Sequence, residues 1–167
     1  MKKNILLASL ILSLVLTSCG MLKGNSASNT TTSDPAAATS QTTEASQMGK
    51  NAGSALDYLT AQYKSAGKLD MSNMMNIANM LNLVGAAQQV YAHKSDSNYR
   101  KGFVKGMIAN SINIDESNAE SVTDKLQSLA ENTNMDKLNS AVQKGQATAT
   151  EVENVASSVT NIIKLFK

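Results

Sequence analysis

The sequence predicts an all-α protein, a small bundle of about five amphipathic helices that follows an apolar amino-terminal helix and a disordered Ser/Thr-rich tether. From Met48 onward, apolar residues recur three and four positions apart, which is the period of one helix face. No segment alternates apolar and polar residues for long, as a half-buried strand would. Clusters of Gly, Asn and Ser separate the periodic segments and mark the turns between helices.

The amino-terminal segment carries Lys2 and Lys3 and then an almost purely apolar run from Ile5 to Leu16. This length suits the apolar part of a signal peptide and is short for a membrane span. The run ends in Leu16-Thr17-Ser18-Cys19, which contains the only cysteine of the chain. The order of these features resembles the signal sequence of bacterial lipoproteins.

The resemblance covers only about the first twenty residues and implies a fate for Cys19. In that family the cysteine sulfur receives a diacylglycerol, a peptidase cuts before the cysteine, and the freed amine is often acylated. Residues 1–18 would then be the signal peptide, and the lipid on Cys19 would be the one covalent group, with no other cofactor expected. An uncleaved helical anchor and ordinary secretory cleavage are the alternatives.

A linker is expected after the cysteine, so that residues 19–47 form a lipidated amino terminus with a flexible chain. Of the twenty-eight residues from 20 to 47, eleven are Ser or Thr, and no apolar period runs through them. Such a composition offers no face to bury and predicts disorder. The helical domain is therefore expected to span residues 48–167.

The first two helices follow from their apolar stripes. One helix is predicted from Ala52 to Ala66 and is stopped by Gly67. The next begins near Asp70 or Ser72 and runs to about His93. Its main stripe is Met74, Ile77, Leu81, Val84, Gln88 and Tyr91, and further apolar residues lie off that stripe. A helix that is apolar on more than one side is expected at the centre of the bundle.

A third helix is predicted from Tyr99 to about Asn110, with Gly102 and Gly106 one turn apart. Each glycine costs about 1 kcal/mol of helix propensity relative to alanine, so close approach of another backbone should compensate. The small residues of the central helix, Gly85 to Ala87, are the expected partners.

Three helices complete the chain. Ser117 and Glu120 have the spacing of a capping box and are predicted to open the fourth. A short helix at 135–144 should end at Gly145. The last helix begins near Thr148 or Thr150 and keeps heptad spacing in Val152, Val155, Val159, Ile162 and Phe166.

Charge and cysteine content narrow the functional classes. Removal of Lys2 and Lys3 from the fifteen basic residues leaves thirteen, which balances the thirteen acidic ones. A neutral body has no general attraction for nucleic acid, so no nucleic-acid partner is expected. With its one cysteine committed to lipid, the chain has no disulfide framework.

The sequence does not predict an enzyme. His93 is the only histidine, and no HExxH, P-loop or GxSxG motif occurs. A histidine at the end of an apolar helix is expected to be a cap or a partly exposed surface residue. Ser65 and Lys68 have the S-x-x-K spacing of penicillin-binding enzymes, but the companion motifs are missing.

One basic region is a candidate partner-binding surface, formed by Lys94, Tyr99, Arg100, Lys101, Phe103 and Lys105. An acidic run follows it at Asp115, Glu116, Glu120 and Asp124. Such runs are commonly solvated faces or weak pairs between neighbouring helices. The alternative is a docking surface for a polar partner, for which the basic region is the better candidate because of its two aromatic residues.

A cluster of methionines gives a second candidate site. Met71, Met74, Met75 and Met80 fall within ten residues. Soft thioethers select Cu(I), and Met71, Met74, Met75 and His93 are the candidate ligands. The other interpretations are ordinary core packing and an adaptable apolar binding groove.

These observations predict a membrane-anchored lipoprotein of the bacterial cell envelope with a non-catalytic binding, structural or accessory role, with an envelope protein as its partner. The alternative is a periplasmic carrier of Cu(I) or of a small apolar ligand. In the lipoprotein family, aspartate after the cysteine marks inner-membrane retention, and here Gly20 follows Cys19. The resemblance therefore favours the outer membrane, and its periplasmic face over the cell surface.

Overall fold

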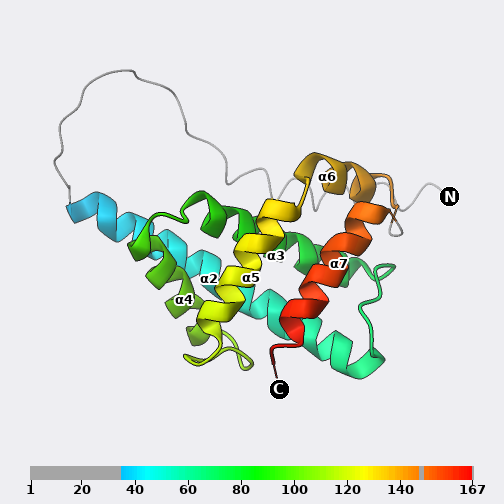
Figure 1. The fold of residues 1–167 in the computed structure, drawn as a ribbon, viewed down its shortest axis with the longest axis horizontal. Coiled ribbons are helices and arrows are strands. Elements are labelled where there is room, and N and C mark those ends of the chain that lie inside the picture. Colours follow the sequence, from blue (N-terminus) through cyan, green and yellow to red (C-terminus); the bar gives the residue numbers. More distant parts are fainter. Residues whose placement is uncertain (1–34, 147–148, 167) are drawn as a thin grey trace. The chain divides into compact units, whose positions relative to one another are not determined.

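The structure, a computed structural model, describes residues 35–146 and 149–166, with side chains from residue 41 onward. This part of the chain contains six helices and no strand, so the all-α class is confirmed, and the helices correspond to the six predicted segments, one more than the expected total of about five. In chain order they are α2 (Pro35–Ala66), α3 (Met74–Ala92), α4 (Ser97–Ala109), α5 (Ala119–Asn132), α6 (Met135–Gln143) and α7 (Thr150–Ile163) (Figure 1).

The first helix begins well before the predicted domain boundary at Met48. α2 is 32 residues long and starts at Pro35, a residue favoured in the first turn because its fixed φ suits a helix. Residues 35–47 are therefore helical, and the expectation that the linker reaches residue 47 is wrong. Ala45 is fully buried, so the helical domain includes this stretch. The predicted signal peptide, Cys19 and the rest of the linker lie outside the described residues.

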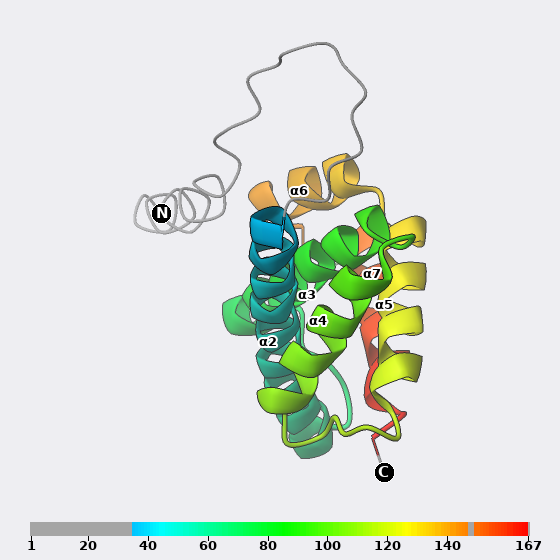
Figure 2. The same cartoon turned by 90° about the vertical axis from the view of Figure 1, so that its left-hand side faces the viewer.

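Glycines bring α2 and α4 into backbone contact. A Cβ placed on Gly106 would lie 2.1 Å from the Ser46 carbonyl oxygen, and one on Gly49 would lie 2.0 Å from the Phe103 carbonyl oxygen. Gly102 faces Thr42 and Ala45 in the same way, at 3.1 Å. Thr42 pairs with Gly102 and Ser46 with Gly106, so the two helices run in the same direction, side by side (Figure 2). The predicted close approach is confirmed, but its partner is α2 and not residues 85–87 of α3.

α3 lies at the centre of the bundle, as predicted, and contacts α2, α4, α5 and α7. Its buried face differs from the predicted main stripe. The buried residues are Asn76, Ile77, Met80, Leu83, Val84, Ala86, Ala87 and Val90. Met74, in contrast, is 53% exposed. Ile77 and Val84 of the predicted stripe are buried, and the off-stripe residues Met80, Leu83 and Val90 are buried as well. Both sets are needed because α3 must fill space between neighbours on several sides.

Polar caps and two glycines set most helix ends. Asn73, Asp96 and Asn134 accept backbone N–H bonds at the starts of α3, α4 and α6. Gly67 and Gly145 follow α2 and α6 with φ of 71° and 66°, a left-handed conformation that favours glycine.

The predicted capping box at the start of α5 is wrong. The Ser117 hydroxyl donates to Asp115 Oδ1 at 2.6 Å and does not cap the helix. The Glu120 side chain turns to Arg100 on α4. The N-cap of α5 is Asn118, whose side chain makes no cap hydrogen bond.

The carboxyl-terminal helices close the core. α7 packs against α5 and α6, and α6 lies across one end of the bundle (Figures 1 and 2). All five heptad residues predicted for the last helix are buried, which confirms that stripe: Val152, Val155, Val159, Ile162 and Phe166. They join residues from the other five helices in one apolar cluster.

Candidate functional site

The expected lipid site, Cys19, is outside the described residues. Among the helices that the structure describes, none combines the length and the apolar character needed to cross a membrane. The remaining candidates lie on α3, α4 and the segment between α6 and α7, and the structure separates them into different environments.

The aromatic half of the predicted partner surface is buried. Tyr99 is 1% exposed and Phe103 is fully buried, because this face of α4 packs into the core. Neither ring can meet a partner at the surface, so the sequence-based assignment of these two residues to a docking surface is wrong. The four-residue spacing that placed them together on α4 is the spacing of its core face.

Arg100 is occupied by the acidic run of α5. Its Nη2 lies 2.6 Å from Glu120 Oε2 and 2.8 Å from Asp124 Oδ1, and its Nε donates to Glu120 at 2.9 Å. Partial burial by itself lowers the pKa of Arg100, but the hydrogen bonds to Asp124 and Glu120 outweigh burial and raise that pKa. Arg100 of the basic region and the acidic run therefore form a bridge between α4 and α5, as expected for weak pairs between neighbouring helices.

Three lysines of the basic region remain exposed: Lys94, Lys101 and Lys105. The Lys94 ammonium lies 4.3 Å from the centroid of the Tyr91 ring, a cation–π contact. The neighbouring His93 stacks on Tyr99, with ring centroids 4.1 Å apart and planes inclined by 13°. His93 follows α3 as its C-cap, which agrees with the expected capping role.

The proposed soft-metal ligands do not form one site. His93 follows the last residue of α3, while Met74 is its first, and α3 has 19 residues. That separation is about 28 Å at the rise of an α-helix, so the structure excludes His93 from a site with Met71, Met74 and Met75. Met80 is fully buried, whereas Met75 is 57% exposed. The four methionines thus occupy different environments.

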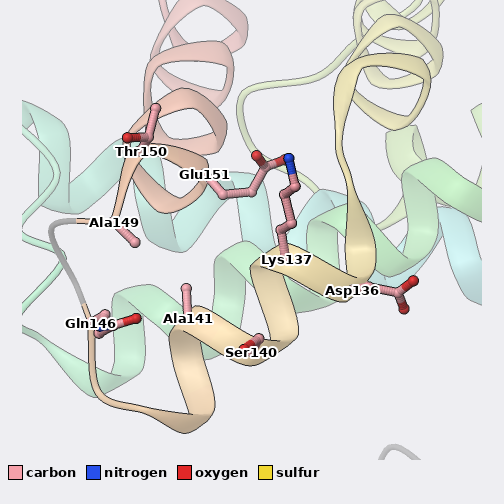
Figure 3. Close-up of a pocket in the computed structure, with 8 residues that line it drawn as sticks. All are labelled: Asp136, Lys137, Ser140, Ala141, Gln146, Ala149, Thr150 and Glu151. Carbon is pink, nitrogen blue, oxygen red and sulfur yellow. The ribbon is translucent and has the colours of Figure 1, made fainter.

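An open depression of about 520 Å³ lies where α6 meets the start of α7. It is lined by Asp136, Lys137, Ser140, Ala141, Gln146, Ala149, Thr150 and Glu151. Lys137 and Glu151 extend toward each other from the two helices (Figure 3). Glu151 Oε1 also accepts the backbone N–H of Asn134 at 2.8 Å, so it ties α7 to the start of α6. The described residues contain no group of three His, Cys, Asp or Glu side chains placed to hold a metal ion.

The sequence pattern missed a polar cluster around Asp57. Asp57 Oδ1 accepts from Ser111 Oγ and from Asn113 Nδ2, each at 2.7 Å, and Oδ2 accepts from the backbone N–H of Ile112 at 2.8 Å. Asn110 adds bonds from its side chain to the Lys50 carbonyl and the Ser54 hydroxyl. The cluster fixes the α4–α5 loop on α2, and Ile112 at its tip is 93% exposed.

The only signal for this cluster in the sequence is the polar run that follows α4. That run does not identify Asp57, more than fifty residues earlier in the chain, as its partner. Comparisons with protein-family models, with curated proteins and with solved structures find no match.

Proposed function

We propose that this chain is a lipid-anchored protein of the bacterial cell envelope, and that its helical domain acts by binding or as a structural or accessory component. One observation carries the proposal. Two lysines, an apolar run and the box Leu16-Thr17-Ser18-Cys19 occur in the order that bacterial lipoprotein signals use. Two or three acyl chains on Cys19 would give a stable anchor, because each buried methylene contributes about 0.8 kcal/mol.

The non-catalytic part of the proposal is supported by the way the domain uses its reactive side chains. His93 stacks on Tyr99, Asp57 holds a loop, and Arg100 bridges α4 to α5. Each of these groups already has a structural contact. The proposal therefore assigns them to packing.

The anchor is tested by growing the source bacterium, or a bacterial host, with labelled palmitate. The expected result is incorporation of label into the wild-type chain and recovery of the chain with membranes. Cys19→Ser should lose both the label and the membrane recovery. A serine variant that stays membrane-bound, or a wild-type chain without label, would refute the anchor.

The destination is tested at Gly20. The family pattern places aspartate after the cysteine in retained proteins, so Gly20→Asp should move the chain from the outer- to the inner-membrane fraction on a density gradient. Gly20→Ser is the matched control and should leave the distribution unchanged. An equal distribution of both variants would contradict the proposed sorting.

A binding role is tested at the three lysines that remain exposed. Among the described residues, Lys94, Lys101 and Lys105 form no salt bridge with the acidic run, whereas Arg100 is bound to it. The triple change of these lysines to glutamate should release a protein that co-purifies in fixed stoichiometry with the wild type. Lys125→Glu, at an exposed lysine of α5, is the control and should retain that protein. If the triple variant still retained that protein, the three lysines would not be part of the interface.

A further inference from the structure

The methionines of the described domain differ in solvent exposure, and Met48, Met71 and Met135 are partly buried against the core. Met74 and Met75 are 53% and 57% exposed, and neither belongs to the apolar cluster of the core or packs against it. Met80 and Met107 are fully buried within that cluster. Two of the three large apolar residues that are exposed in the described part of the chain are therefore adjacent thioethers.

The start of α3 does not depend on these two side chains. Asn73 caps the helix by accepting the backbone N–H of Met75 at 2.9 Å, and Asp70 accepts both the backbone N–H and the hydroxyl of Ser72. The turn before α3 is thus held by polar side chains. A chemical change at either methionine sulfur would leave these bonds in place.

We infer that Met74 and Met75 form a site of reversible oxidation by peroxides. A sulfur lone pair attacks the terminal oxygen of the peroxide, the O–O bond breaks, and an S–O bond forms. The sulfur loses two electrons, the peroxide is reduced, and the proton of the transferred oxygen passes to the leaving oxygen, which departs as water or an alcohol. The product is methionine sulfoxide, which methionine sulfoxide reductases convert back to the thioether with two electrons from a thiol reductant, which becomes a disulfide while the oxygen leaves as water.

The position of the pair makes its oxidised form compatible with the fold. α3 has no acidic side chain in its first turn, where the helix dipole favours negative charge. A sulfoxide oxygen carries partial negative charge, so it suits this end of the helix and is also better solvated than an exposed thioether. Oxidation of Met80 or Met107 would instead place a polar group in the core.

Hydrogen peroxide, added to the full-length chain in detergent, tests the site, with peptide mass spectrometry as the readout. Met74 and Met75 should oxidise at least about tenfold faster than Met80 and Met107, since exposure governs the reaction. In guanidinium chloride the four rates should converge, which attributes the difference to the fold. Met74→Leu/Met75→Leu should remove the fast reaction and leave the rates at Met80 and Met107 unchanged.

Stability and repair provide the second readout. After oxidation at Met74 and Met75 alone, the thermal midpoint should stay within about 2 °C of the untreated chain. Methionine sulfoxide reductases should restore both residues in the folded protein. Equal rates at the exposed and buried methionines, a fall in midpoint on oxidation of the exposed pair, or sulfoxides that the enzymes cannot reduce would each overturn the inference.

Discussion

Gly106→Ala is expected to separate α4 from α2 and to destabilise the domain. The new Cβ would lie 2.1 Å from the Ser46 carbonyl oxygen and 2.8 Å from its carbonyl carbon. These are backbone atoms that cannot rotate away, so the helices must move apart by roughly 1 Å to restore normal contact.

The magnitude is the balance of two effects. Alanine in place of glycine stabilises a helix interior by about 1 kcal/mol. Overpacking costs about 1–3 kcal/mol and occasionally more, and here the separation also weakens the contacts of Ala45 and Phe103 across the interface. Because both Ser46 atoms that the new Cβ would meet belong to the backbone, we expect the upper part of that range to apply. The net loss in the free energy of unfolding should then be about 2 kcal/mol.

Urea unfolding of the full-length chain, followed by far-ultraviolet circular dichroism, measures the effect. Gly85→Ala is the matched control, since a Cβ at Gly85 in α3 meets nothing within 4 Å, and it should stabilise the domain by up to about 1 kcal/mol. Gly49→Ala should resemble Gly106→Ala, because its Cβ would lie 2.0 Å from the Phe103 carbonyl oxygen.

One separation of the helices relieves both clashes, so the double variant should lose less than the sum of the two single losses. If Gly106→Ala were as stable as Gly85→Ala, the reasoning about this interface would be refuted. If the stability losses of the two glycine variants were strictly additive, the explanation that one separation of the two helices relieves both clashes would be refuted.

Three further outcomes follow from named contacts. Burial, and then the charge of Glu44, raises the pKa of Tyr99 to about 12, so the unfolded chain releases this proton at lower pH than the folded one. Stability should therefore fall as pH rises from about 10 to about 12, and Tyr99→Phe should make this fall shallower in urea titrations at each pH. Asp57→Ala removes the acceptor of three hydrogen bonds, so it should lower the free energy of unfolding by about 2–3 kcal/mol and speed proteolysis at the α4–α5 loop. Asp57→Asn should lose less stability. Equal protease resistance of the wild type and both variants would contradict this role of Asp57. Glu120→Gln weakens an ion pair whose carboxylate is 62% exposed, so thermal unfolding should show a change of less than about 1 kcal/mol, and a larger one would mean that the pair is more than a surface contact.

Sequence periodicity was sufficient for the last helix, where large side chains on one face carry the burial. The four predicted stripe residues on α7 are buried, as is the fifth, Phe166, beyond its end, and the glycines after α2 and α6 end those helices as expected. In these places one local pattern determines one local structure, so no knowledge of the neighbouring helix is needed.

Periodicity failed where small residues carry the burial. Ala45 and Gly49 contact α4 closely, yet alanine, glycine, serine and threonine together have the composition of a linker. The hydrophobicity of such a segment is low, and only the presence of Gly102 and Gly106 on the facing helix makes it a packing surface. That information lies in the pairing of two helices and not in either one.

The candidate sites show the same division. The expected weak pairing between neighbouring helices holds for Arg100 with Glu120 and Asp124. The docking alternative placed Tyr99 and Phe103 at the surface because they lie among cations, and both are buried. Asp57 was missed because its partners on the α4–α5 loop are brought to it only by the fold.

The start of α2 at Pro35 sets a limit on how far the domain could travel if Cys19 is held in a membrane. Residues 20–34, fifteen in number, would then join the lipid to the helix, and a chain of that length cannot extend beyond about 50 Å. The linker expected from composition, twenty-eight residues, would have allowed about 95 Å. The volume open to the start of α2 scales with the cube of this radius and is about sevenfold smaller, so the point at which the domain is attached would stay within about 50 Å of the lipid.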